Sequence, residues 1–246
     1  MYFFQKLVYF FFFHTLLLFK WKKSTFETNK RLLHSKSEYK NALSHLLDEL
    51  LNTLFRSKIT LDPLDKTNQV ILDELKLNHG ILLTAHIGNH EYFGQYLKSE
   101  GVDLRAFHQE LNSPFWNRLM NKYRLSRGNY SPYSDKQLLK AIKDFKSKRF
   151  LVGFLWDQHT KSKKYIPLAL GSKTYSTNKL PTFFLKEDTP IYFGYLSKSS
   201  KKYSITLKRV SHLAAYPELL KEAIDTIPEQ YYGIFHKIYK SSTHYK

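Results

Sequence analysis

Apolar residues in the first part of the chain recur with the period of an amphipathic helix. The positions with i, i+3, i+4 and i+7 spacing are Leu43, Leu46, Leu47, Leu50, Leu51 and Leu54. This spacing predicts a helix that packs one face against the rest of the protein.

Beyond this helix, short apolar runs alternate with amphipathic segments. The runs at residues 81–85, 104–107, 150–155, 165–168, 191–196 and 203–210 predict strands. The segments at residues 90–98, 113–123, 134–145, 177–186, 217–224 and 229–239 predict helices. Strands that alternate with helices are typical of a mixed, largely parallel sheet covered by helices. We therefore predict an α/β fold with a single domain over residues 24–246.

Residues 1–23 stand apart from this pattern. An apolar run at residues 7–19, broken by His14 and Thr15, is followed by Lys20, Lys22 and Lys23. A membrane-spanning helix needs about 20 apolar residues, so this run is short. Its aromatic start and its basic end nevertheless suit a helix that inserts shallowly or barely spans, with the basic end on the cytoplasmic side. We predict a membrane-anchoring helix here, and a buried core helix is the alternative.

The net charge indicates which kinds of partner the protein favours, and the cysteine content excludes several kinds of site. Lys and Arg outnumber Asp and Glu by 39 to 21, which gives a net charge of +18 and favours anionic partners such as phospholipids, nucleic acid or an acidic carrier protein. The chain contains no cysteine. Disulfides, thiolate nucleophiles and thiolate metal sites are therefore excluded.

The segment HIGNHE places two histidines and a carboxylate around a strand-to-helix turn. His86 and His90 would share a face, as zinc ligands do, only in a continuous helix. Because Gly88 and Asn89 lie between them, we predict that Asn89 caps the helix and that the two histidines point in different directions. Glu91 in the first helical turn would then accept a hydrogen bond from one ring nitrogen of His86 and leave the other nitrogen as a base.

Several blocks of the sequence resemble one family in order along the chain. HIGNHE, ELNSPFWNRLMNKYR, LVGFLWDQ, YIPLALGSKTYSTN, DTPIYFGYL and IPEQYYGIFHKIYK are similar to blocks of the bacterial lipid A biosynthesis (lauroyl/myristoyl) acyltransferases, within the lysophospholipid acyltransferase superfamily. The resemblance implies that His86 is the general base and that Glu91 orients it, without metal or other cofactor. It further implies an acyl carrier protein or coenzyme A thioester as acyl donor, a lipid acceptor, and a place on the cytoplasmic side of the bacterial inner membrane.

Further site residues are predicted around this pair. Backbone amides at Gly88 and Asn89 are candidates for binding the oxyanion at the start of the helix. Asp157 and Gln158, at the end of a strand, are expected either to line the same cleft or to cap the following loop. Arg124 is a candidate phosphate ligand, and Arg118 is expected on a solvated helix face.

The sequence also departs from the family pattern. Gln109, a candidate substrate-binding residue, stands where the family usually has an arginine near the acceptor, and His90 stands where tryptophan is usual. These departures bear on the lipid A precursor as acceptor more than on acyl transfer, because His86 and Glu91 are both present. The rival interpretation is a basic lipid- or nucleic-acid-binding protein without catalysis.

Overall fold

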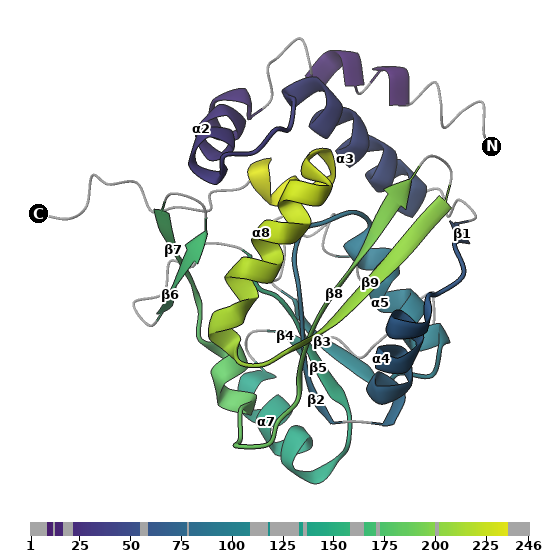
Figure 1. The fold of residues 1–246 in the computed structure, drawn as a ribbon, viewed down its shortest axis with the longest axis vertical. Helices are drawn as coiled ribbons and strands as arrows, with labels where there is room; N and C mark the ends of the chain where they lie inside the picture. Colours follow the sequence, from purple (N-terminus) through teal and green to yellow (C-terminus); the bar gives the residue numbers. More distant parts are fainter. Residues whose placement is uncertain are drawn as a thin grey trace, which may run out of the picture.

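A computed structural model describes residues 9–11, 13–16, 22–54, 59–77, 79–108, 118, 133–134, 137–157, 165–170, 173–199 and 202–235. Within these ranges the chain forms one mixed sheet with helices on both faces and a separate hairpin (Figure 1). The main strands are β1 (Thr60–Leu61), β2 (Gly80–Thr84), β3 (Leu104–His108), β4 (Tyr133–Ser134), β5 (Leu151–Leu155), β8 (Ile191–Ser199) and β9 (Lys202–Val210). The hairpin consists of β6 (Tyr165–Leu170) and β7 (Lys173–Asn178).

The order of strands in the main sheet is β1-β9-β8-β2-β5-β3-β4. Every neighbouring pair is parallel except β8 and β9, which are antiparallel. The predicted mixed, largely parallel sheet is therefore confirmed. In parallel sheets the carboxyl ends of neighbouring strands meet at one edge, which is where ligand sites form in open α/β folds.

Helices cover the two faces of the sheet because both faces are apolar. The α-helices are α2 (Lys23–Leu33), α3 (Tyr39–Leu54), α4 (Lys66–Leu77), α5 (His90–Ser99), α7 (Leu138–Ser147) and α8 (Tyr216–Thr226). Alternate residues of β2 belong to different cores: Ile81 and Leu83 pack in the cluster that includes α7 and α8, whereas Leu82 packs with α4 and α5. This alternation is the period-2 pattern of a strand buried on both sides.

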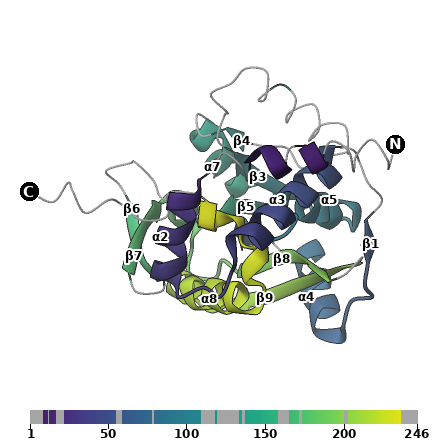
Figure 2. The same ribbon diagram turned by 90° about the horizontal axis from the view of Figure 1, so that it is seen from above.

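Helices α2 and α3 lie over the carboxyl ends of the central strands. Figure 1 shows both helices at the top of the view; in Figure 2, seen from above, α3 crosses over the strands and α2 lies to the side, toward the hairpin of β6 and β7. The 3-10 segments η4 (Pro228–Gln230) and η5 (Tyr232–Phe235) contact this layer, whereas η2 (Leu180–Phe184) contacts α7 and η3 (Leu213–Ala215) lies next to α8. The carboxyl-end edge is therefore covered by the amino-terminal helices and by the last described residues.

Two predicted helices are wrong in the part of the chain that the structure describes. The segment at residues 177–186 begins as the end of β7, which pairs antiparallel with β6, and continues as η2. The start of the segment at residues 229–239 is the 3-10 pair η4 and η5, and residues 236–246 lie outside the described ranges. Pairing with β6 makes residues 177 and 178 part of a strand, whereas residues 180–184 keep local bonds with the tighter 3-10 spacing. Helices α2 and α4 and the short strands β1 and β4 were not predicted.

The amino-terminal segment packs onto α3 where it is described. Residues 9–11 and 13–16 are helical, the hydroxyls of Tyr9 and Ser44 lie 2.6 Å apart, and Phe13 is buried in the core. Phe10 and Phe11 of the same segment are 55% and 61% exposed. Among the helices of the described ranges, none combines the length and apolar composition that a membrane crossing requires.

Candidate active site

His86 and Asp157 form a hydrogen-bonded pair at the carboxyl-end edge of the sheet. The Nδ1 atom of His86 lies 2.8 Å from Oδ1 of Asp157, and the backbone N–H of His86 donates to Oδ2 of the same carboxylate at 3.0 Å. The Asp157 side chain is fully buried and the His86 side chain is 15% exposed. Because an ionised carboxylate only accepts hydrogen bonds, the pair favours the tautomer with the proton on Nδ1 and the lone pair on Nε2.

Strand register explains why these two residues meet. Strands β2 and β5 are parallel neighbours, and the last residue pair of their ladder is Thr84 with Leu155. Continuing both chains in step brings His86 opposite Asp157. The backbone N–H of Trp156 donates to the carbonyl of Thr84 at 3.0 Å, which holds the two chains together just beyond the strands.

The backbone just before Asp157 and just before His86 is held by one side-chain hydroxyl each. Thr177 of β7 is buried, and its hydroxyl donates to the carbonyl of Trp156 at 3.3 Å. The hydroxyl of Tyr216, at the start of α8, donates to the carbonyl of Thr84 at 3.1 Å. Neither Thr177 nor Tyr216 was predicted to belong to the site, because no sequence spacing relates them to His86.

Residues 86–89, which we call the histidine turn, have a conformation that requires glycine. Gly88 has a φ of +52°, and a Cβ atom there would lie 1.7 Å from the carbonyl oxygen of Leu196. A side chain is excluded both by the left-handed conformation and by the close approach of β8. The turn thereby reverses the chain direction within a few residues and starts α5 beside the end of β2.

Gly88 has no backbone N–H left for an oxyanion. That N–H donates to the carbonyl of Gln230 at 2.9 Å. The predicted role of Gly88 as an oxyanion ligand is therefore wrong in this arrangement, because a single donor is already used inside the protein.

Asn89 is the predicted cap of α5, and the structure confirms it. Its side-chain oxygen accepts the backbone N–H of Tyr92 at 2.9 Å, and the residue is 3% exposed. The oxyanion role predicted for Asn89 concerned its backbone N–H and stays a prediction. Its importance for the site lies in the position that it gives to the start of α5.

Residues 228–235, the last described segment, bind the histidine turn through backbone hydrogen bonds. The backbone N–H of Tyr232 donates to the carbonyl of His86 at 2.7 Å. The side chain of Gln230 both accepts from the N–H of Lys198 and donates to its carbonyl, each at 2.7 Å. Gln230 thus ties the turn to β8, and the 3-10 geometry of this segment follows from these long-range bonds. The sequence signal for this role was the Pro-Glu-Gln block, which carried no physical assignment.

Glu91 lies in the first turn of α5, as predicted, where the helix dipole favours its negative charge. The carboxylate at Nδ1 of His86, however, comes from Asp157. Asp157, and not the predicted Glu91, therefore holds this nitrogen and fixes the tautomer of His86. Stabilisation of the imidazolium by Glu91 remains a prediction.

The rings of His86 and His90 contact each other. Their centroids lie 5.1 Å apart at an interplanar angle of 63°, an edge-to-face arrangement. The expectation that the two histidines point apart is therefore wrong, because the tight histidine turn brings the first residue of α5 back beside the strand end. Over the described ranges no group of three or more His, Cys, Asp or Glu side chains is arranged to hold a metal ion.

The remaining predicted site residues lie mostly outside the described ranges. This applies to Gln109, Arg124 and Gln158, and to the predicted helix at residues 113–123 apart from Arg118. Arg118 is exposed, as expected for a solvated position. The binding roles predicted for Gln109, Arg124 and Gln158 stay predictions.

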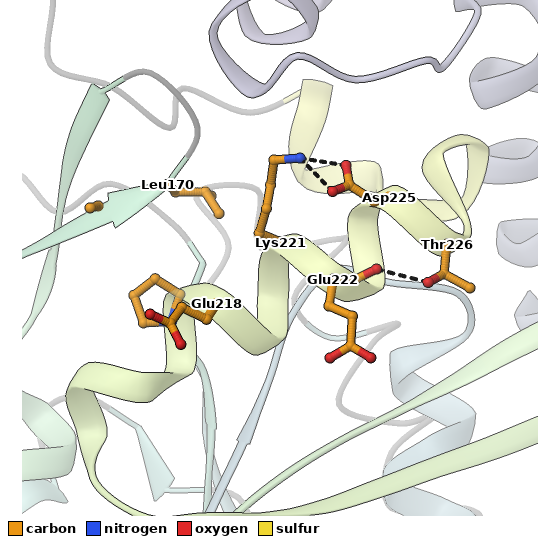
Figure 3. Close-up of a pocket in the computed structure, with 8 residues that line it drawn as sticks. Leu170, Glu218, Lys221, Glu222, Asp225 and Thr226 are labelled. Atoms are coloured by element: carbon orange, nitrogen blue, oxygen red, sulfur yellow. Dashed lines mark hydrogen bonds and ion pairs between the residues drawn. The ribbon is translucent and has the colours of Figure 1, made fainter.

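An open groove elsewhere on the molecule is lined by β6 and α8 (Figure 3). Its charged side chains are largely paired with each other or with neighbours: Lys221 contacts the carboxylate of Asp225, and Glu222 contacts Lys208 at 2.6 Å. The groove contains none of the predicted site residues. Exposed ion pairs of this kind contribute little to stability and need no functional explanation.

Comparison with known proteins adds no assignment. No protein-family model matches the chain, and no curated protein matches it either. The site is therefore characterised by its own geometry: a buried carboxylate that fixes a partly exposed histidine at the carboxyl-end edge of an α/β sheet.

Proposed function

We propose that the protein is an acyltransferase that moves a fatty acyl chain from a thioester to a hydroxyl group of a lipid. The observation that carries the proposal is the hydrogen-bonded pair of His86 and Asp157 at the end of two parallel strands. A histidine whose Nδ1–H is held by a buried carboxylate presents Nε2 as a proton acceptor, which is what activation of a hydroxyl needs. The family resemblance of the surrounding blocks supplies the reaction class.

The reaction needs one base and no covalent intermediate with the protein. Nε2 of His86 removes the proton of the acceptor hydroxyl as its oxygen attacks the thioester carbonyl. The C–O bond forms, the C–S bond breaks, and the imidazolium returns the proton to the departing thiolate. Positioned general-base catalysis of this kind typically contributes about 10² to 10⁴-fold to the rate.

Two carboxylates would stabilise the imidazolium in this scheme. Asp157 holds Nδ1 directly, and its second oxygen holds the backbone of the same residue. Glu91 contributes a further negative charge from the first turn of α5. We assign Asp157 the orienting role and Glu91 an electrostatic role.

The amino-terminal segment has features that favour contact with a membrane, where a lipid substrate would be found. Phe10 and Phe11 are exposed on a helical segment whose Phe13 is anchored in the core. Exposed aromatic residues beside lysines favour the interfacial region of a bilayer. We propose that the acceptor is a lipid A precursor or a related glycolipid or lysophospholipid. The acyl donor would be a thioester of acyl carrier protein or coenzyme A, and the reaction would take place at the cytoplasmic face of a bacterial inner membrane. The net charge of +18 suits both anionic lipid and an acidic carrier protein.

The test uses the full chain, purified in detergent, with labelled acyl thioesters and a panel of lipid acceptors. We expect transfer by the parent protein and loss of about 10² to 10⁴-fold in His86→Gln, because the base is removed. His212→Gln is the matched control, since His212 is exposed and lies after β9. A His86→Gln protein that transfers acyl chains at the parent rate would exclude the mechanism.

The rival interpretation, binding without catalysis, predicts a different set of results. A nucleic-acid-binding protein would show no transfer and would lose affinity for nucleic acid steeply with added salt. Retention on vesicles at high salt, together with turnover, supports the acyltransferase. Lipid mass spectrometry of cells with and without the gene would then identify the acceptor and the acyl chain.

A further inference from the structure

The exposed side of α7 carries a row of lysines. Ala141 and Phe145 pack into the core, whereas Lys140, Lys143 and Lys146 are exposed. The spacing of three residues places the three lysines along one side of the helix, over about 9 Å of its axis. We call these three residues the lysine stripe.

The charges of the lysine stripe are not neutralised by the described part of the chain, where none of the three lysines forms an ion pair. Asp144 is the only acidic residue of α7. Its carboxylate accepts the hydroxyl of Tyr133 on β4 at 3.0 Å and lies 3.9 Å from Lys148. By contrast, Lys208 and Lys221 beside the groove on α8 are both paired with carboxylates. The stripe therefore presents three uncompensated positive charges, which attract an anionic surface.

The amino end of α7 lies at the edge of the sheet that carries the His86–Asp157 pair. Strand β3 is parallel to both β4 and β5, so the carboxyl ends of the three strands point to the same edge. Only residues 135–137 separate the end of β4 from the start of α7, and Asp157 comes shortly after the end of β5. The lysine stripe therefore begins at this edge and runs from there down the side of the sheet.

The surroundings of the stripe favour an acidic protein over a membrane or a nucleic acid. Figure 1 shows α7 in the lower part of the view, whereas the amino-terminal segment with the exposed Phe10 and Phe11 lies at the top. The stripe is therefore far from the segment that favours contact with a membrane. Leu139, beside the stripe on α7, is 84% exposed. An apolar side chain next to charged ones suits the surface of a protein better than a row of phosphates.

We propose that the lysine stripe is the docking surface for an acidic acyl carrier protein, which delivers the acyl thioester to His86. The identity of the partner rests on the proposed function, whereas the charge and the position of the stripe rest on the structure alone. Acidic side chains of the carrier would face the three lysines, and its thioester would enter from the amino end of α7. Charges at the rim of an interface act on association more than on chemistry. The stripe should therefore affect the KM for the carrier-bound donor and leave kcat nearly unchanged.

The test compares two donors with the same labelled dodecanoyl chain, one bound to acyl carrier protein and one to coenzyme A, using the full chain in detergent. An exposed ion pair contributes a factor of about 1.5 to 5 in affinity. We therefore expect the triple variant Lys140→Gln/Lys143→Gln/Lys146→Gln to raise the KM for the carrier-bound donor about 10-fold, and the KM for the coenzyme A donor less than about twofold. Thermal unfolding should match that of the parent, because the three side chains are exposed.

Lys143→Glu and Lys66→Glu form a matched pair of charge reversals. Both are exposed lysines without an ion pair among the described residues, and α4 packs on the other face of the sheet from α7. We expect Lys143→Glu to raise the KM for the carrier-bound donor about fivefold and Lys66→Glu to behave as the parent. Added salt should raise the KM of the parent toward that of the triple variant, because it screens exposed charges. An equal effect of the two reversals would refute docking on α7.

Binding of the carrier protein without turnover separates this inference from the proposed function. In calorimetry with dodecanoyl-loaded carrier protein, we expect the Kd of the triple variant to be about 10-fold higher than that of the parent. A parent that transfers from the coenzyme A donor, but whose Kd and KM for the carrier do not change in the triple variant, would refute the docking surface and leave the proposed function standing. A parent without transfer from either donor, but with carrier binding that depends on the stripe, would refute the function and support the docking surface. If the triple variant keeps its affinity for the carrier but loses binding to phosphatidylglycerol vesicles or to single-stranded DNA, the stripe binds that partner and the proposal is wrong.

Discussion

Replacing Asp157 by asparagine is the sharpest test of the His86–Asp157 pair, because one carboxylate makes two different hydrogen bonds. Its Oδ2 accepts the backbone N–H of His86 at 3.0 Å, and its Oδ1 lies 2.8 Å from Nδ1. A backbone N–H can only donate, so the amide oxygen of the asparagine will take this position. The amide NH₂ must then face Nδ1, which has to become the acceptor.

The substitution therefore leaves the shape of the site intact and reverses the tautomer. The proton moves to Nε2, so this nitrogen can no longer accept the proton of a hydroxyl. In serine-protease triads the same exchange lowers kcat by about 10⁴-fold. We expect a loss of about 10² to 10⁴-fold here, which corresponds to about 3 to 5 kcal/mol of activation free energy. Folding should survive, because the bond to the backbone of His86 is kept and a fully buried charge is removed.

The assay is single-turnover acyl transfer from a labelled thioester, with thermal unfolding measured on the same samples. Asp225→Asn is the matched control, since Asp225 is an exposed aspartate on α8 that pairs with Lys221. A folded Asp157→Asn protein with a rate within about threefold of the parent would refute the proposed tautomer and the orienting role of Asp157.

Three further predictions concern the support of the site. Gly88→Ala should lower the free energy of unfolding by at least about 2 kcal/mol, because a left-handed alanine costs about 1 to 2 kcal/mol and its Cβ would lie 1.7 Å from the Leu196 carbonyl oxygen. The measurement is urea titration, with Gly101→Ala as the control. Gly101 has a φ of +92° and open space around its Cβ position, so the comparison separates the steric clash from the backbone strain. Gln230→Glu should cost about 1 to 3 kcal/mol by the same titration, since a carboxylate cannot donate to the carbonyl of Lys198; an unchanged midpoint would show that this bond contributes nothing. Burial raises the pKa of Glu49 on α3, so its stabilising contribution is present below the unfolded pKa of about 4.3 and is lost as pH rises through the folded pKa. In chemical unfolding, the stability of Glu49→Gln relative to the parent should therefore grow with pH over this window. A difference in stability that does not change with pH would contradict the raised pKa.

Local patterns were sufficient for most of the central elements. The apolar spacing of residues 43–54 corresponds to α3 (Tyr39–Leu54), and the apolar runs at residues 81–85 and 150–155 correspond to β2 and β5. The cap of α5 could also be predicted from the sequence, because Asn89 directly precedes the helix and its side chain accepts the backbone N–H of Tyr92 in the first helical turn. Helix periods, strand runs and caps depend on neighbours a few residues away, and such neighbours are visible in the sequence.

Long-range contacts decided the elements that local patterns missed. The segment at residues 177–186 contains helix-compatible positions, but pairing with β6 makes its beginning a strand. The segment after Pro228 is bent into 3-10 turns because its backbone binds the histidine turn. In both cases the backbone forms hydrogen bonds with distant residues.

The candidate site divides in the same way. The sequence by itself determined His86, the glycine turn and the start of α5, because these features follow each other along the chain. It favoured Glu91 as the partner of His86 for the same reason of proximity. Only the tertiary structure brought in Asp157, which is 71 residues away from His86. The register of two parallel strands and the docking of a helix across their ends create neighbours that no sequence spacing encodes.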